Sequence, residues 1–323
     1  MSEPLTTDVP SEPSIRDTPS TEDFPFPLLP VDCFKKRIIK REKEEAARRE
    51  EAARKEEAAR KEEAARKQMA PPSSQNVVFA MRLRSPPPPK QNTNKALPPV
   101  FSLAKYANFS YDQQEISACT SFAFAASFRI SAKIQKKYMN FFPSTLFLYY
   151  QERVAQGTTG QDAGADLADG LAYARNNGVC GEALWPFNGG ANVLVNPSPA
   201  CYAQAPKYKI ASYTVVNMTS ISGNALILAI KTRLSQSPVQ VGIYVYSSFQ
   251  DLDKNGVVPM PGAGEQIRGG HEVVIIGYDD VKQLFLMKNS WGQWGLKGYG
   301  FFYLPYAYIA DPNKCLEVTW FKL

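Results

Sequence analysis

The sequence predicts an α+β domain of two lobes that is preceded by an extended N-terminal arm. Two observations support this fold class. First, 15 of the 25 prolines lie in the first hundred of the 323 residues, and this skew is typical of an extended segment rather than of a second folded domain. Second, helical patterns dominate the rest of the chain up to about residue 210, and short β-branched and aromatic runs follow. Helices and strands that are separated in this way indicate an α+β architecture.

Charge and composition exclude several classes of protein. Residues 1–100 hold 19 Lys and Arg against 16 Asp and Glu, and residues 101–323 hold 18 against 15. Each part therefore carries a net charge of +3, and neither predicts a nucleic-acid-binding domain. No apolar run reaches the roughly 18 to 20 residues that a membrane span needs. The polar N-terminus shows no secretory signal, and five scattered cysteines do not suggest a disulfide framework. We therefore expect an intracellular, cytoplasmic protein.

The N-terminal arm divides into three predicted segments. Residues 1–33 are rich in Ser, Thr, Pro and acidic side chains, which predicts disorder around a short apolar patch at 24–31. In residues 34–70 the unit EEAAR(R/K) repeats four times with a period of six, which predicts a single charged, Ala-rich helix. Each repeat places a Glu four positions before a basic residue, as in Glu50 and Arg54, and this spacing favours intrahelical ion pairs. Residues 71–96 are Pro-rich and predict an extended linker.

The period of six also bears on the role of this helix. Successive Ala pairs rotate around the helix, so the repeat has no apolar seam for a coiled coil. Two interpretations remain open: a semi-rigid spacer that tethers the domain to an unknown partner, or a charged helix in solvent with no role of its own.

Residues 97–323 are expected to fold into the globular domain. A helix should follow Cys119, and two more should lie within 142–154 and 166–178; these form a helical lobe at about 110–210. The lobe at about 211–323 should be rich in strands. Its predicted strands are PVQVGIYVY at 238–246, HEVVIIGYD at 271–279, QLFLMKN at 283–289 and GYGFFYLP at 298–305, each bounded by turn residues.

Three polar residues in this domain are unremarkable when each is taken alone. Cys119 would most often be a small buried side chain, His271 a structural histidine and Asn289 a turn residue. They occur, however, in three segments that form a joint pattern: DQQEISACTSFAF at 112–124, GGHEVVIIGYD at 269–279 and KNSWGQWGLKGYG at 288–300. In addition, a Cys at the N-terminus of a buried helix is placed where the helix dipole favours its thiolate.

These motifs resemble those of the papain-like cysteine peptidases, and the resemblance covers most of residues 97–323. In that family a Gln lies six residues before the nucleophilic Cys, as Gln113 lies before Cys119. The family His opens a strand that is matched by HEVVIIGYD, and the family Asn lies in KNSWG, where this chain has Asn289. The resemblance implies a papain-like fold with a helical lobe and a β-barrel-like lobe. It also implies a cysteine endopeptidase that hydrolyses peptide bonds through a Cys–His–Asn triad and a thioester acyl-enzyme.

The resemblance assigns a role to each candidate residue. Cys119 would be the nucleophile and His271 the general acid–base that pairs with it. Asn289 would orient the imidazole, and Gln113 would bind the oxyanion together with the Cys119 N–H.

Two further residues are expected to line the substrate site. Trp291 would shield the His–Asn hydrogen bond from water. Gly164 aligns with the second glycine of a family segment that binds the extended substrate backbone. This chemistry calls for no cofactor and no metal ion.

Several departures from the family pattern distinguish this chain. Ile116 stands where secreted members have a disulfide-bonded Cys, Thr120 stands where they have a Trp, and Gly270 replaces the usual Asp or Asn before the catalytic His. These features resemble the branch found in bacteria and large DNA viruses, so a virus-associated protein is also expected. Residues 1–96 lack the helical propeptide pattern of the cathepsin zymogens.

Alternatives to the endopeptidase remain open. The same fold could serve an amidase or exopeptidase, or a binding or tethering protein that does not cleave. Retention of Cys119, His271, Asn289 and Gln113 together counts against the last of these. The expected partner is a protein or peptide substrate and not a nucleic acid. Cys180 and Cys201 could approach each other closely enough for a disulfide, although free thiols are favoured in a reducing compartment.

Overall fold

The computed structural model describes residues 96–323, with the exception of 217 and 219, and nine isolated residues of the N-terminal arm. The chain divides into two units: one contains Pro99–Leu323 together with Met1–Val31, and the other contains Asp32–Pro98. The predicted disordered segment 1–33 lies outside the described residues except at Leu28, and the predicted linker 71–96 does so except at Ala96.

The predicted arm helix is described at eight positions, and all eight are helical: Lys43, Ala47, Glu50, Glu51, Ala53, Arg54, Lys55 and Glu57. The Arg54 guanidinium donates to the Glu50 carboxylate at 2.5 Å, and the Lys55 ammonium lies 2.6 Å from the Glu51 carboxylate. Both pairs join residues four apart, with the Glu on the N-terminal side. Because all four side chains are exposed, these pairs add little to stability.

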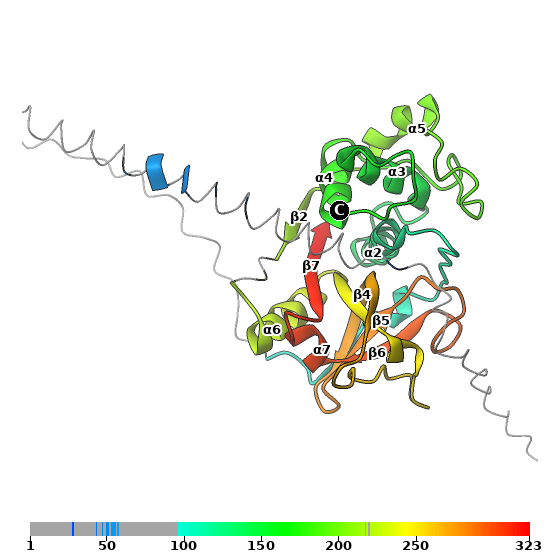
Figure 1. Ribbon diagram of the computed structural model, residues 1–323. Coiled ribbons are helices and arrows are strands. Elements are labelled where there is room, and N and C mark those ends of the chain that lie inside the picture. The colour runs from blue at the N-terminus through cyan, green and yellow to red at the C-terminus, as the bar shows by residue number, and fades with distance from the viewer. Residues whose placement is uncertain are drawn as a thin grey trace, which may run out of the picture. The chain divides into compact units, whose positions relative to one another are not determined.

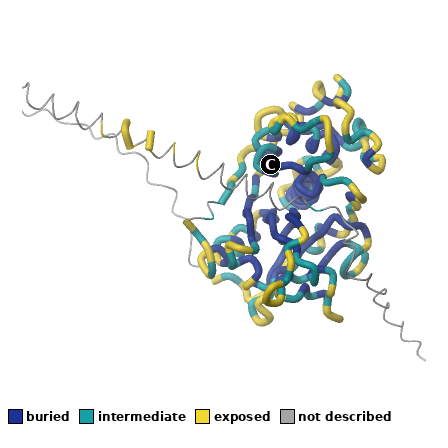
Figure 2. Tube along the Cα trace, in the orientation of Figure 1, coloured by how far each residue is buried: buried dark blue, intermediate teal, exposed yellow. Residues whose placement is uncertain are grey.

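Four helices form one lobe of the domain: α2 (Cys119–Gln135), α3 (Thr145–Gln156), α4 (Leu167–Asn176) and the short α5 (Pro199–Gln204) (Figure 1). The predicted helix after Cys119 is therefore α2, and almost all of its residues from Cys119 to Ala132 are buried (Figure 2). A helix that is apolar on nearly every face is expected at the centre of a domain rather than at its surface.

The loop between α3 and α4 is fixed at both ends. Gly157 ends α3 in the left-handed conformation, with φ of 69°. Asp166 caps α4 because its side chain accepts a hydrogen bond from the Ala168 N–H at 2.9 Å. Well-formed helix ends therefore fix where the loop begins and ends, and Asp162 within it accepts a hydrogen bond from the Ser117 N–H, two residues before α2.

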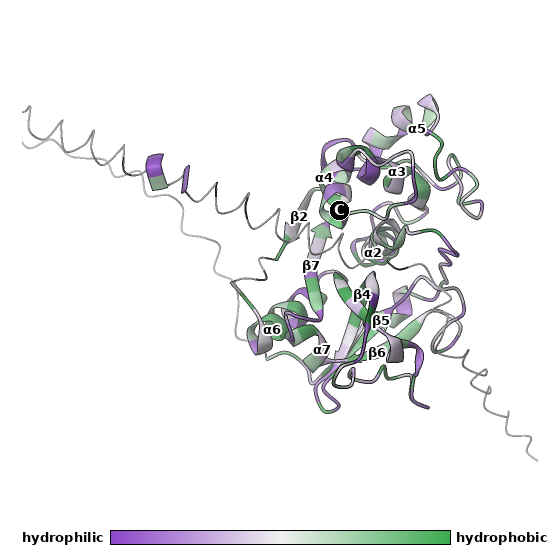
Figure 3. Ribbon diagram, in the orientation of Figure 1, coloured by the Kyte–Doolittle hydropathy of each residue, from purple (hydrophilic) through white to green (hydrophobic). Residues whose placement is uncertain are grey.

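Seven strands form the sheet of the other lobe: β1 (Val100–Ser102), β2 (Ser212–Val215), β3 (Val239–Tyr246), β4 (Ile267–Asp279), β5 (Leu284–Lys288), β6 (Phe301–Pro305) and β7 (Cys315–Lys322). All their pairings are antiparallel, in the order β2-β7-β3-β4-β5-β6, and β1 pairs with β4. Figure 3 shows hydrophobic residues interspersed with more polar ones along these strands. The residues of β3 and β4 are almost continuously buried, as expected for central strands.

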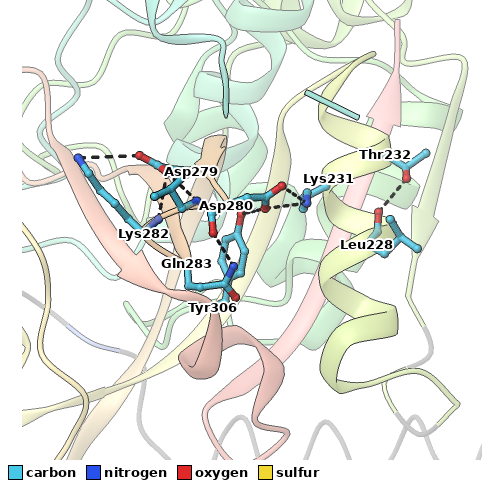
Figure 4. A network of polar contacts seen from close by, with 9 residues as sticks. Leu228, Lys231, Thr232, Asp279, Asp280, Lys282, Gln283 and Tyr306 are labelled. Carbon is cyan, nitrogen blue, oxygen red and sulfur yellow. Dashed lines mark hydrogen bonds and ion pairs between the residues drawn. The ribbon is translucent and has the colours of Figure 1, made fainter. Parts of the chain in front are cut away.

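Two helices of this lobe were not predicted: α6 (Gly223–Leu234) and α7 (Tyr306–Ala310). Both are tied to the turn between β4 and β5 by one carboxylate (Figure 4). The Lys231 ammonium lies 2.6 Å from Asp280, and the Tyr306 hydroxyl donates to Asp280 at 2.8 Å. Within residues 96–323, the described part of this domain also contains three short 3-10 segments: η1 (Ala104–Tyr106), η2 (Ala205–Lys207) and η3 (Ser247–Gln250).

The central helix α2 joins the two lobes, because its faces belong to two different cores. Ala123, Ala126 and Ile130 pack in the core that contains the strands β3 and β4. Phe124 and Phe128 pack in the core that contains α3 and α4. The N-terminus of α2 is thereby placed where the two lobes meet.

Among the described helices, none is long and apolar enough to cross a bilayer.

Candidate active site

Cys119 is the first residue of α2, at the end of the helix where the two lobes meet. Its side chain is 1% exposed. Burial raises the pKa of the thiol well above its ordinary value, although the backbone amides of Glu272 and Thr120 act against this by favouring the thiolate. The contact with Glu272 is informative, because Glu272 follows His271 directly on β4. The structure thus brings the predicted nucleophile beside the strand that carries the predicted base.

His271 and Asn289 form the hydrogen bond that the motifs predict. Nε2 of His271 lies 2.8 Å from Oδ1 of Asn289, and both side chains are buried. The same Oδ1 accepts the Ser290 N–H at 2.8 Å, and the Asn289 N–H donates to Gly300 O at 2.7 Å. Asn289 follows the end of β5, so the bond joins two neighbouring strands of the sheet.

The hydrogen bond to Asn289 leaves one ring nitrogen of His271 available. An amide oxygen only accepts, so Nε2 donates and Nδ1 carries the lone pair when the ring is neutral. Among the described residues, Nδ1 has no hydrogen-bond partner. Burial lowers the pKa of His271 to about 4, against the opposing effect of the Asn289 hydrogen bond. In this buried state the imidazole is neutral and can accept a proton.

Trp291 covers the imidazole. Its ring stacks on His271 with centroids 4.5 Å apart and an angle of 22° between the planes. Trp291 is itself packed edge-on against Phe249 and Trp294. An aromatic cluster of the β-rich lobe therefore holds Trp291 over the histidine ring, and the shielding of the His–Asn hydrogen bond from water stays a prediction.

Gln113 contacts Ser290, the residue that follows Asn289. Its N–H donates to Ser290 O at 2.8 Å, and its side-chain Oε1 accepts from the Ser290 hydroxyl at 2.7 Å. Nε2 donates to Ile116 O at 2.9 Å. Like Cys119, His271 and Asn289, Gln113 is at most 3% exposed. The structure thus connects Gln113 to Asn289 through one residue, Ser290.

Gly164 lies in the loop before α4, with φ of 72°, and is buried. Its N–H donates to the Tyr149 hydroxyl at 2.9 Å. That donor is therefore engaged within the protein, and a role of Gly164 in binding the substrate backbone stays a prediction. The Tyr149 hydroxyl also donates to Asp162, which accepts the Ser117 N–H, so these contacts connect Gly164 to the segment before Cys119.

Three residues that the sequence analysis did not single out lie in this network: Ser290, Asp162 and Tyr149. Ser290 could have been found, because it belongs to the KNSWG motif. Asp162 and Tyr149 reach the site from the loop after α3 and from α3 itself. No local pattern in the sequence indicates such contacts.

In the described part of the chain no group of three or more His, Cys, Asp or Glu side chains is arranged to hold a metal ion.

Comparisons with known proteins point to one family. The model of the papain family of cysteine proteases matches residues 104–307. An uncharacterised peptidase C1-like protein of Acanthamoeba polyphaga mimivirus is 33% identical over 229 residues, which cover 68% of this chain and 73% of the viral protein. The crystal structure of xylellain, a cysteine protease from Xylella fastidiosa, is 33% identical and has a TM-score of 0.63; the match covers 70% of this chain and 87% of that one.

A more distant structure shows the same fold. A cysteine protease from Carica candamarcensis in complex with E-64 is 20% identical, with a TM-score of 0.52, and the match covers 70% of this chain and 98% of that one. The predicted α+β, papain-like fold is thereby confirmed, and the viral and bacterial relatives agree with the branch that the motifs indicated. This chain belongs to the papain family of cysteine proteases and is a hydrolase of the cysteine-peptidase class.

Proposed function

We propose that this protein is an endopeptidase that cleaves extended protein segments with Cys119, His271 and Asn289. The observation that carries the proposal is the His271–Asn289 hydrogen bond at 2.8 Å, which leaves Nδ1 as the basic nitrogen. The next residue of the same strand, Glu272, contacts Cys119 through its backbone amide, and Cys119 opens a buried helix. A base whose orientation is fixed by a third residue, close to a thiol, is the arrangement that nucleophilic catalysis requires.

The first half of the reaction forms a thioester. The Cys119 Sγ–H proton passes to His271 Nδ1 as sulfur attacks the peptide carbonyl, and the carbonyl oxygen becomes an oxyanion. The second Nε2 hydrogen of Gln113 and the N–H of Cys119 would donate to this oxygen; the first amides of a helix have no intrahelical acceptor. The imidazolium then gives its proton to the leaving amine, the C–N bond breaks, and the acyl group remains on sulfur.

The second half of the reaction returns the enzyme to its starting state. His271 Nδ1 takes a proton from water, the resulting hydroxide oxygen bonds to the thioester carbon, and the C–S bond breaks. The sulfur recovers the proton from the imidazolium, and the peptide acid leaves. Burial raises the pKa of the thiol and lowers the pKa of the imidazole, so it disfavours the charged form of each group taken alone. The opposite charges of thiolate and imidazolium favour the ion pair.

A combined cleavage and labelling experiment tests the proposal. The full chain is incubated with a mixed peptide library, and the products are identified by mass spectrometry; E-64 is then added to the wild type and to Cys119→Ala. We expect cleavage at internal peptide bonds, with inhibition and labelling of the wild type only. Release of single terminal residues would indicate an exopeptidase instead. Labelling of Cys119 without any cleavage would favour the binding or tethering alternative.

A further inference from the structure

Asp162, in the loop between α3 and α4, binds the backbone N–H of Ser117, two residues before the proposed nucleophile. Asp162 accepts the Ser117 N–H with both of its oxygens, at 3.2 and 3.0 Å. The Tyr149 hydroxyl donates to the same carboxylate. The fold therefore brings a negatively charged acceptor to a backbone amide that lies outside any helix or strand.

The peptide group between Ile116 and Ser117 contacts Asp162 through its N–H and Gln113 through its carbonyl oxygen. Ile116 O and the Ser117 N–H belong to one planar unit, so neither can rotate without the other. Ile116 O accepts hydrogen bonds from Gln113 Nε2 at 2.9 Å and from the Ala118 N–H at 2.8 Å. A rotation that broke the bond to Asp162 would also turn the carbonyl away from the Gln113 amide.

The Gln113 side chain is held at two points. Ser290 fixes its oxygen and Ile116 O fixes one hydrogen of its nitrogen. The direction of the second Nε2 hydrogen follows from these two contacts, because the amide group is planar. The Ile116–Ser117 peptide thus helps to set the donor that remains for the oxyanion.

We propose that Asp162 is a positioning residue that orients the Gln113 amide through the Ile116–Ser117 peptide group. This inference rests on the proposed function, in which Gln113 binds the oxyanion. Asp162 itself touches no reacting atom. In the secreted members that this chain resembles, a disulfide-bonded Cys occupies the place of Ile116; here the carboxylate supplies a non-covalent anchor one residue later.

Asp162 is held in place by Tyr149, which is buried together with Arg153. Burial, together with the negative charge of Asp162, raises the pKa of Tyr149, so the phenol stays protonated and donates to the carboxylate. The Tyr149 oxygen in turn accepts the Gly164 N–H. Arg153, one turn further along α3, donates to Gln161 O at 2.9 Å and lies over the Tyr149 ring, 4.2 Å from its centroid.

A double-mutant cycle on the full chain tests the proposal. Asp162→Asn keeps the size of the side chain but replaces one acceptor oxygen with a donor, which opposes the Ser117 N–H or the Tyr149 hydroxyl. We expect kcat for a peptide substrate to fall by about ten-fold or more with KM nearly unchanged, because the oxyanion forms only in the transition state. Gln113→Ala should lower kcat by roughly 10²–10³. Adding Asp162→Asn to Gln113→Ala should then cost little more.

Alkylation of Cys119 by iodoacetamide separates positioning from a general loss of structure. This displacement reaction forms no oxyanion, so Asp162→Asn should be alkylated within about two-fold of the wild-type rate. The matched control is Asp166→Ala, which removes the cap of α4 in the same loop. We expect this control to lower the melting temperature while leaving kcat within about two-fold.

Several outcomes would overturn the proposal. These are full activity in Asp162→Asn, a fall in alkylation as large as the fall in kcat, or the same ten-fold cost on the Gln113→Ala background. If Asp162→Asn does not fold, Tyr149→Phe tests the same chain of contacts, with a smaller fall in kcat that disappears in Gln113→Ala. A wild type that cleaves no peptide would contradict the proposed function and this inference together. Cleavage by the wild type with no effect of Asp162→Asn would contradict this inference alone.

Discussion

His271 lies on β4 and Asn289 directly follows β5, and their side chains share a 2.8 Å hydrogen bond under the ring of Trp291. The bond determines which nitrogen of the histidine can act as a base. It also depends on the register of the sheet, since β4 pairs with β5 so that Val274 faces Lys288, the residue before Asn289. Two motifs that are separate in the sequence become one acid–base unit through this register.

The first prediction concerns the nucleophile. Cys119→Ala should abolish peptide hydrolysis, because no other group in the proposed mechanism can form the thioester. The circular dichroism spectrum should be almost unchanged, since the substitution removes only the sulfur from a buried position. Activity close to wild type, measured after active-site titration of the wild type, would show that Cys119 is not the nucleophile.

The second prediction concerns the orientation of the histidine. Asn289→Ala should retain partial activity, with kcat lower by roughly ten- to hundred-fold, a part of the ~10²–10⁴ that a positioned acid–base group contributes. The backbone bond from the Asn289 N–H to Gly300 O is independent of the side chain and should keep the strand in place. Steady-state kinetics beside His271→Ala provide the comparison: equal loss in both variants would mean that Asn289 does more than orient the ring.

The fold class and the residues of the three motifs could be predicted from the sequence. The helix after Cys119 has an apolar pattern on nearly all faces, and the strands that carry His271 and precede Asn289 are short runs of β-branched and aromatic residues. The helix α6 was missed because GNALILAIKTRL lies within a strand-rich region. Its buried residues Leu226, Ile230 and Leu234 nevertheless recur four residues apart, which is a helical spacing.

The positioning contacts could not be predicted in the same way. Asp162 is 45 residues from Ser117 in the sequence, and both stand in loops with no periodic pattern. Their contact depends on the packing of α2 against α3 and on the length of the loop that Gly157 and Asp166 bound. The sequence also gave no indication that the Gly164 N–H would be engaged by Tyr149, because this bond joins a loop to a helix side chain.

The third prediction follows from the pKa of His271. Burial lowers it to about 4 in the folded protein from about 6.5 when exposed. The unfolded chain therefore binds more protons between these values, and the free energy of unfolding should fall as the pH is lowered from about 6.5 to about 4. At about 1.4 kcal/mol for each pH unit, His271 contributes at most about 3 kcal/mol to this fall.

Urea unfolding at pH 7 and pH 5 measures this effect. The comparison is made between Cys119→Ala and Cys119→Ala with His271→Gln, because without the thiol no ion pair can raise the pKa of the histidine. The first protein should lose more stability at pH 5 than the second. Equal losses would show that the folded protein binds the imidazolium as readily as the imidazole.

The fourth prediction concerns Cys180 and Cys201, which the structure places side by side as free thiols. Both are fully buried, and burial, followed by the neighbouring Cys201, raises the pKa of Cys180. Unlike Cys119, both lie in the core that contains α3 and α4, and the single histidine of the chain lies on β4. A buried thiol with no base to take its proton is a poor nucleophile, so neither should react with iodoacetamide until the protein is unfolded. Mass spectrometry of protein prepared with a thiol-blocking reagent should find two free thiols. A quantitative Cys180–Cys201 linkage would contradict both this prediction and the expected reducing compartment.

The last prediction concerns the arm. The unit Asp32–Pro98 is separate from the unit that contains the candidate site, so it should not be needed for the chemistry. Deletion of residues 34–96 should therefore change kcat/KM of a short peptide by no more than a few-fold.

Leu28 is different, because it packs against the core of the β-rich lobe. A chain that begins at Leu97 also loses this contact, and should have a lower melting temperature than the internal deletion. A rise in activity of more than ten-fold in both variants would show that the charged helix is inhibitory and not a spacer, whereas the same rise only in the shorter chain would assign the restraint to the segment around Leu28.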